Sequence, residues 1–172
     1  NKVVYVHNNS AKQVNILLAF PNKITYNDKN FVFIKIVCSI LKNILFKKLR
    51  TELNLVYGVS VKPSSIKYGS TIIISVNANK DKAEMVIKYV LYFLDHYKKI
   101  NCTENEVSSV KKTYKYSFNN NIGNNSNERI FNQYKNQILH LQSFDSKKLK
   151  SVCEIKKEID SISPDKFREL LN

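Results

Sequence analysis

Apolar residues recur every three or four positions over much of the chain, which is the spacing of one face of an α-helix. The first such pattern spans residues 31–49, and Asn27 or Asp28 can cap the helix that it predicts. Its apolar positions are Phe31, Ile34, Val37, Cys38, Leu41, Leu45 and Leu49. A helix of this length leaves room for a break near Lys42-Asn43.

The second half of the chain predicts further helices. Residues 82–97 carry a strong pattern, and Thr103 with Glu106 forms a capping box that starts the next helix. We expect the inward positions of these two helices to be Ala83, Val86, Ile87, Val90, Leu91, Leu94, Val107, Val110, Tyr114 and Phe118. Two more helices carry their apolar residues at Ile130, Tyr134, Ile138 and Leu141 and at Leu149, Val152, Ile155 and Ile159. The polar residues 119–127 predict a loop, and Ser163-Pro164 starts a last short helix to Leu171.

Other stretches predict strands. Residues 3–6 and 14–20 read as strands joined across a polar turn at Asn8-Asn9-Ser10. Residues 71–77 predict another strand, and the run Ile72-Ile73-Ile74 indicates that it is buried on both faces.

Between these strands, Tyr57, Val59 and Val61 alternate with smaller or polar residues. This period of two predicts a half-buried strand in which these three side chains share one face. We expect Pro63-Ser64-Ser65 to end the strand, which can then pair with residues 71–77 as a hairpin.

The predicted order is strand, helix, two strands and then several helices. This order is typical of an α+β domain with a mostly antiparallel sheet and helices packed on one face. No repeat or linker divides the chain, so we expect residues 1–172 to form one domain. The chain begins at Asn1 rather than at Met, and we expect it to be part of a longer polypeptide.

Composition narrows the functional classes. The chain has 172 residues, of which 43% are hydrophobic, and a formal net charge of +14. No apolar run is long enough to span a bilayer, so no membrane partner is expected. The lysines are scattered along the predicted helices, which favours solvated helix faces, with a basic nucleic-acid-binding domain as the alternative. Cys38, Cys102 and Cys153 are odd in number and far apart, which favours a reducing compartment over a disulfide framework.

Motifs for catalysis are missing from the chain. The histidines His7, His96 and His140 are not at metal-ligand spacing, and no H-x-x-E-H or H-E-x-x-H run occurs. The chain has three glycines, which are dispersed, so there is no phosphate-binding loop. By itself the chain is expected to catalyse nothing and to bind no metal or other cofactor.

Arg50 and Tyr57 stand out as candidate binding residues, seven positions apart where a predicted helix ends, turns and enters a strand. A guanidinium and a phenolic hydroxyl at one wall of a cleft suit the binding of peptide carbonyls. The plainer interpretation is that Arg50 pairs with Glu52 or with the helix C-terminus, and that Tyr57 is an ordinary strand aromatic.

Residues 45–59, LFKKLRTELNLVYGV, resemble a hallmark of the inverzincin metallopeptidases, which include insulin-degrading enzyme, pitrilysin and the mitochondrial processing peptidase. The zinc-free domain of that family carries the pattern L-F-x-x-[LI]-R-x-x-x-G-L-x-Y-x-V. The order of strands and helices before and after this stretch is similar as well. Asn54 stands where the family usually has glycine, and asparagine tolerates the left-handed backbone that such a turn requires. The family's final strand after the last helix is absent.

The resemblance implies a clamshell peptidase in which this domain faces a zinc-carrying half, on the same chain or a partner chain. Zinc and a general-base Glu would lie on that half, and a peptide or protein would be the substrate. Tyr57 would donate a hydrogen bond to the developing oxyanion, and Arg50 would hold a neighbouring backbone carbonyl. The complete protein would then be a zinc metallopeptidase, although residues 1–172 alone would be inactive. The alternative is a non-catalytic scaffold or partner subunit of the same fold.

Overall fold

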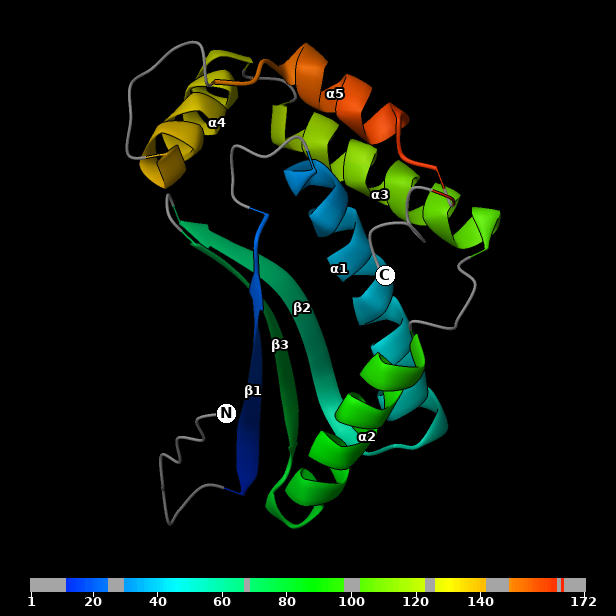
Figure 1. The fold of residues 1–172 in the computed structure, drawn as a ribbon. Coiled ribbons are helices and arrows are strands. Elements are labelled where there is room, and N and C mark those ends of the chain that lie inside the picture. Colours follow the sequence, from blue (N-terminus) through cyan, green and yellow to red (C-terminus); the bar gives the residue numbers. More distant parts are fainter. Residues whose placement is uncertain are drawn as a thin grey trace.

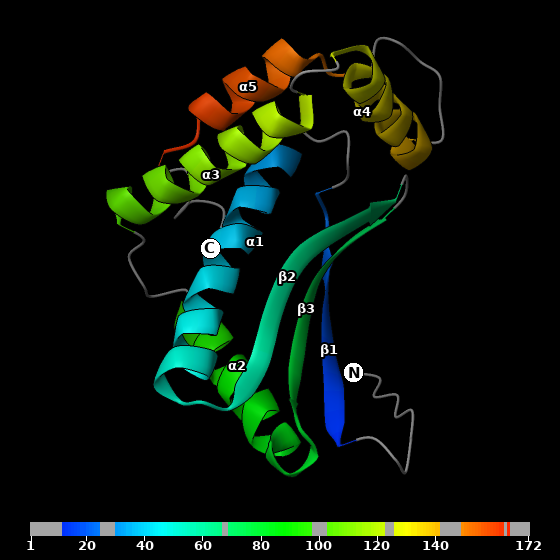
Figure 2. The same ribbon diagram turned by 180° about the vertical axis from the view of Figure 1, so that it is seen from behind.

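Helices cover one face of a three-stranded antiparallel sheet in the computed structural model of the chain (Figures 1 and 2). This arrangement confirms the expected α+β class. The structure describes these parts of the chain: residues 12–24, 30–66, 69–97, 103–122, 126–141, 149–163 and 165. Several predictions lie outside these residues: the strand at 3–6 with its turn, the cap at Asn27 or Asp28, and the helix after Ser163-Pro164.

The elements follow one another as the pattern predicts, with two short helical segments that it does not. They are β1 (Gln13–Asn22), α1 (Phe31–Phe46), the π-helical segment η1 (Lys47–Glu52), β2 (Val56–Ile66), β3 (Gly69–Asn79), the 3₁₀ segment η2 (Lys80–Lys82), α2 (Ala83–Tyr97), α3 (Glu104–Ile122), α4 (Ser126–Leu141) and α5 (Val152–Asp160). The two segments η1 and η2 each lie next to an end of a sheet strand.

The strand order in the sheet is β1-β3-β2, so β3 is the central strand and β2 lies at an edge of this described sheet. The predicted β2–β3 hairpin is confirmed, with Val61 paired to Ile74. The prediction that Pro63-Ser64-Ser65 ends the strand is wrong, because β2 continues to Ile66 and Pro63 pairs with Ile72. An edge strand tolerates proline, since its missing N–H can face away from the neighbouring strand.

The two faces of β3 differ strongly in burial. Ile74, Val76 and Ala78 are buried beneath the helices, whereas Ile73 is only half-buried and Asn77 is exposed. The prediction that this strand is buried on both faces is therefore wrong. Three consecutive isoleucines do not reveal that helices cover only one side of the sheet.

Helix α1 forms the centre of the hydrophobic core. All seven apolar positions predicted for residues 31–49 are buried. Further α1 residues, such as Phe33, Ile36 and Ile40, are buried too, because α1 contacts β2 on one side and α3 and α5 on the other. Burial raises the pKa of the Cys38 thiol to about 12. The helix passes Lys42 and Asn43 without a break and continues directly into η1.

The later helices confirm the pattern with two corrections. The capping box at the start of α3 is present, with Glu106 N–H donating to Thr103 Oγ1 at 3.3 Å and Thr103 N–H donating to Glu106 Oε2 at 3.0 Å. Leu91 is 47% exposed, so its predicted inward position is wrong, whereas Val86 and Val90 are fully buried. The predicted loop at 119–127 is also wrong in extent, because α3 runs to Ile122 and α4 begins at Ser126.

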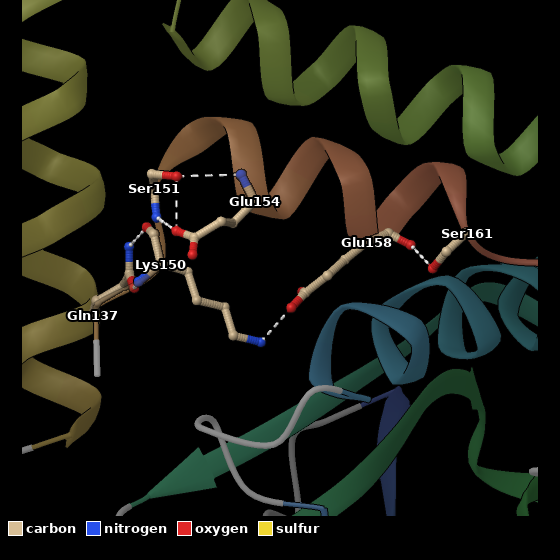
Figure 3. A network of polar contacts seen from close by, with 6 residues as sticks. All are labelled: Gln137, Lys150, Ser151, Glu154, Glu158 and Ser161. Atoms are coloured by element: carbon tan, nitrogen blue, oxygen red, sulfur yellow. Dashed lines mark hydrogen bonds and ion pairs between the residues drawn. The ribbon is translucent and has the colours of Figure 1, made fainter. Parts of the chain in front are cut away.

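A network of polar side chains connects α4 with the start of α5 (Figure 3). Gln137 of α4 is 2% exposed, and its amide group both donates to the Lys150 carbonyl and accepts from the Lys150 N–H, each at 2.8 Å. Ser151 and Glu154 then form a capping box at the first turn of α5. Lys150 also pairs with Glu158, eight residues further along the chain, at 2.7 Å.

Candidate functional site

Arg50 lies in the last turn of η1, where the chain leaves the helix layer at the lower end of Figure 1. Leu49 is fully buried beside it and anchors this turn in the core. The backbone is wider here than in an α-helix, since the Leu53 N–H donates to the Lys48 carbonyl at 3.0 Å and the Leu55 N–H to the Leu49 carbonyl at 2.8 Å. Such π-type turns are rare and occur frequently at functional sites.

Asn54 reverses the chain between η1 and β2. Among the described residues it is the non-glycine residue with a positive φ, 48°. This is the left-handed region, which costs most L-residues about 1–2 kcal/mol and which asparagine visits more readily. The turn therefore keeps the geometry expected of a glycine, as the sequence predicts.

Tyr57 occupies a β-bulge at the start of β2. Val56 pairs with Ala78 and Gly58 pairs with Asn77, so Tyr57 is the extra residue between them. Because of this bulge, Val56 and Val59 face the core while Tyr57 is 48% exposed. The prediction that Tyr57 shares a face with Val59 is wrong, since strict alternation fails at a bulge.

The structure brings Arg50 and Tyr57 together on the surface. The Arg50 Cζ atom lies 6.0 Å from the centre of the Tyr57 ring. Arg50 Nη1 donates to the Val56 carbonyl at 3.2 Å and to Asn54 Oδ1 at 3.3 Å. Both bonds fix the guanidinium against the turn, close to the tyrosine.

The plainer interpretation of Arg50 is partly supported. Arg50 does bond to backbone at the end of a helix, but Glu52 pairs with Lys48, at 2.7 Å, rather than with Arg50. The carboxylate nearest in sequence therefore does not neutralise Arg50. In the described part of the chain, the donors on Arg50 Nη2 and Nε have no protein partner.

Two further residues complete the site, and the sequence pattern did not reveal either. The Tyr57 hydroxyl donates to Asn79 Oδ1 at 2.8 Å, and Lys82 Nζ lies 3.5 Å from the Asn54 carbonyl oxygen. These contacts span 22 and 28 residues. Asn79 stands before a predicted helix, where asparagine reads as an ordinary cap, so no local signal distinguishes it.

The site is an open, positively charged surface. Arg50 and Lys82 both donate to Asn54, one to its side chain and one to its backbone. Two hollows among the described residues lie elsewhere: one of about 320 Å³ between α3 and the end of α5, and one of about 260 Å³ between α1 and α3. The Arg50–Tyr57 pair is exposed on this surface, and its positive charge suits the binding of carbonyl oxygens or other negative groups.

The described residues offer no metal centre. No group of three or more His, Cys, Asp or Glu side chains among them is placed to hold a metal ion. His96 is exposed at the end of α2, with Nδ1 2.9 Å from the Tyr92 carbonyl oxygen. A search of the described helices for a membrane-spanning segment found none of sufficient length and hydrophobicity.

Comparison with protein families yields one match. The family described as "Peptidase M16 inactive domain" matches residues 1–114, which include β1, the helix α1 and the whole candidate site. No curated protein sequence matches the chain.

Solved structures share the fold over nearly all of this chain. A peptidase M16 inactive domain from Pseudomonas fluorescens superposes with a TM-score of 0.74 at 15% identity, covering 94% of this chain and 38% of that chain. A protease from Helicobacter pylori gives a TM-score of 0.76 at 16% identity, covering 97% of this chain and 40% of that chain. A chain of complex III2 from Candida albicans gives 0.72 at 16% identity, covering 95% and 40%. The chain therefore spans less than half of the length of each of these relatives.

Proposed function

Because this chain belongs to the family of M16 peptidase inactive domains, we propose that it is the non-zinc, substrate-binding domain of a zinc metallopeptidase. In this family an inactive domain pairs with an active half, on the same or another chain. The activity of the complete protein would be hydrolysis of peptides that fit between the two halves. Arg50 and Tyr57 would contact the peptide from this side.

One observation carries the proposal: three local departures from regular structure together place Arg50 and Tyr57 on the surface. These are the π-helical segment η1, the left-handed Asn54 and the β-bulge at Tyr57. The left-handed residue costs free energy relative to regular structure, and π-type turns and β-bulges both occur frequently next to functional sites. An ordinary helix-to-strand turn would bury the same apolar residues without displaying this pair.

Arg50 is suited to hold a backbone carbonyl of a peptide. Its Nη1 atom is fixed to the Val56 carbonyl and to Asn54 Oδ1, so the planar guanidinium is oriented before a substrate arrives. The donors on Nη2 and Nε then face a partner without a large loss of side-chain entropy. Arg50 would keep the peptide in register, which contributes to rate through positioning.

Tyr57 is suited to stabilise an oxyanion. Its phenolic hydroxyl is a single donor at the end of a rigid side chain, and its ring lies near the Arg50 charge. A donor placed where negative charge develops lowers the barrier, because it interacts more strongly with the transition state than with the ground state. Removal of one such donor typically lowers kcat on the order of a hundredfold.

Zinc does not fit the described residues of this chain, which lack a set of metal ligands. We propose that the metal lies on the opposing half. When bound there, zinc would supply an activated water for peptide hydrolysis.

Arg50→Ala and Tyr57→Phe test the proposal in the complete natural polypeptide with a quenched fluorescent peptide mixture. We expect each variant to lower turnover on the order of a hundredfold and a metal chelator to abolish cleavage by the unaltered protein. Lys47→Ala and Tyr92→Phe are matched controls, because both residues are exposed and neither contacts the site. Chelator-sensitive cleavage that neither Arg50→Ala nor Tyr57→Phe reduces would contradict the roles of these residues.

A non-catalytic scaffold is the second candidate. It is favoured by the similarity to a chain of complex III2 from Candida albicans, at a TM-score of 0.72. This alternative predicts no H-x-x-E-H run in the complete polypeptide or in its partner chain, and no cleavage by folded protein supplied with zinc. Stable co-purification with a partner subunit would then be the positive result.

A further inference from the structure

Asn79 makes an unexpected contact for a residue in its position. It ends β3 and precedes η2, with extended backbone angles of φ −67° and ψ 148°. Asparagine at such a position commonly caps the following helix with its side-chain oxygen. Here the side chain makes no cap hydrogen bond, and its Oδ1 accepts the hydrogen bond of Tyr57 at 2.8 Å instead. The Asn79 side chain thus bonds to Tyr57 instead of capping the helix.

This contact has a consequence for the proposed role of Tyr57. A phenolic hydroxyl carries one proton and therefore donates one hydrogen bond at a time. While the proton points at Asn79 Oδ1, it is not available to a substrate oxyanion. The hydroxyl must release Asn79 before it can act.

An asparagine side chain can reverse its part in this bond without moving away. Rotation of its amide by half a turn replaces the Oδ1 acceptor with the Nδ2 donor at nearly the same place. The Nδ2–H group can then donate to the Tyr57 oxygen, which frees the hydroxyl proton. A hydrogen bond received by the hydroxyl oxygen also polarises the O–H group and strengthens its donation.

We propose that Asn79 is the positioning residue of Tyr57: it holds the hydroxyl as an acceptor at rest and as a donor when substrate is bound. The inference rests on the proposed function of the Arg50–Tyr57 pair and adds the residue that orients its hydroxyl. Asn79 acts through Tyr57 and does not itself contact the reacting atoms.

Asn79→Asp and Asn79→Ala in the complete polypeptide test this inference. Aspartate has nearly the shape of asparagine but only accepts hydrogen bonds, so it would keep the Tyr57 proton in place. We expect Asn79→Asp to lower kcat about as much as Tyr57→Phe, on the order of a hundredfold, with KM little changed. Asn79→Ala should lose only the orientation of the ring, and its kcat should fall less, by roughly tenfold.

The opposite ranking would overturn the inference. If the bond merely braces the fold, Asn79→Asp retains its acceptor and should match the unaltered protein, whereas Asn79→Ala should be the weaker enzyme. Asn127→Asp is the matched control, because it makes the same substitution at an exposed position in the first turn of α4, at the opposite end of the sheet (Figure 1). Its kcat should equal that of the unaltered protein.

Combination with Tyr57→Phe separates this inference from the proposed function. If Asn79 acts through the hydroxyl, Asn79→Asp should have no further effect on kcat in the Tyr57→Phe background. An additive loss would show that Asn79 acts independently and would overturn the inference alone. A Tyr57→Phe variant with unchanged turnover would overturn the role of Tyr57 and this inference with it.

Discussion

Two junctions in this domain show different uses of hydrogen bonds at the end of a helix. The η1–β2 junction (residues 47–57) lies at one end of the sheet, and the α4–α5 junction (Gln137, Lys150, Ser151 and Glu154) lies at the other (Figure 1). In both, side chains bond to backbone groups of a neighbouring element. They differ in where the remaining donors and acceptors point.

At the α4–α5 junction the polar side chains bond to backbone groups of the junction itself. The Gln137 amide pairs with both backbone groups of Lys150, and Ser151 and Glu154 satisfy each other's backbone N–H groups (Figure 3). The capping box is an ordinary way to satisfy the backbone N–H groups at the start of a helix, and none of these residues has a positive φ. The junction therefore has a structural role, since it offers few groups to a ligand.

The η1–β2 junction uses irregular backbone, and the exposed Arg50 keeps donors without a partner among the described residues. Only the Nη1 atom of Arg50 is used within the described residues, and the Tyr57 ring is half exposed. Hydrogen bonds alone thus do not distinguish a binding site from a brace. The distinction lies in whether irregular geometry leaves donors free for another molecule.

The α4–α5 junction should show the largest effect on stability. Gln137→Leu keeps the size of a buried side chain but removes both hydrogen bonds between the Gln137 amide and the Lys150 backbone. We expect the free energy of unfolding to fall by about 2–4 kcal/mol, measured by urea denaturation. Turnover per folded molecule should not change, because the candidate site lies at the opposite end of the sheet (Figure 1).

Leu139→Gln is the matched control on the same helix, because Leu139 is 66% exposed. It should change the free energy of unfolding by no more than about 0.5 kcal/mol. Reduced turnover per folded molecule in Gln137→Leu would show that the two ends of the sheet are coupled and would weaken the contrast.

The next effect concerns the left-handed turn of the η1–β2 junction. Asn54→Ala and Asn54→Gly both remove one of the two acceptors of Arg50, the Asn54 side-chain oxygen, but only alanine is strained at a φ of 48°. We expect the alanine variant to be less stable than the glycine variant by about 1–2 kcal/mol. Its turnover should also be lower, because a shifted turn displaces Tyr57 from Arg50. Thermal melts and peptide cleavage measure the two differences, and equal behaviour of the two variants would contradict the role of the turn.

The smallest effect is expected at the capping box of α5. Ser151→Ala removes the acceptor of the Glu154 N–H, and we expect a loss of about 1 kcal/mol in the free energy of unfolding at neutral pH. The Ser151 backbone N–H and hydroxyl both donate to Glu154, which lowers the pKa of that carboxyl.

This lowered pKa makes the difference between the unaltered protein and Ser151→Ala depend on pH. A depressed folded-state pKa stabilises the fold above the ordinary pKa of the group, and the contribution is lost as the pH falls through the folded-state value. The difference in the free energy of unfolding between the two proteins should therefore be largest at neutral pH and become smaller in acid. Urea denaturation at neutral and acidic pH measures it, and a pH-independent difference would show that Glu154 contributes nothing through its charge.

Much of this fold could be predicted from local patterns in the sequence. The apolar positions from Phe31 to Leu49 are all buried, and the capping box at Thr103 is present. These features depend on residues within about one helical turn of each other, so their spacing along the chain carries the information. The candidate pair Arg50 and Tyr57 came from a family resemblance in an equally short stretch, and its left-handed Asn54 was expected on the same grounds.

Only the tertiary structure decided how that pair is presented. The bulge turns Tyr57 out of the buried face, and the bonds to Asn79 and Lys82 join residues distant in the chain. The burial of Gln137 against Lys150 is of the same kind. Strand register and long-range contacts depend on how separate elements pack, and one sequence pattern is compatible with several registers. The sequence by itself therefore determined which residues form helices and core, whereas packing between the elements determined which side chains meet at the surface.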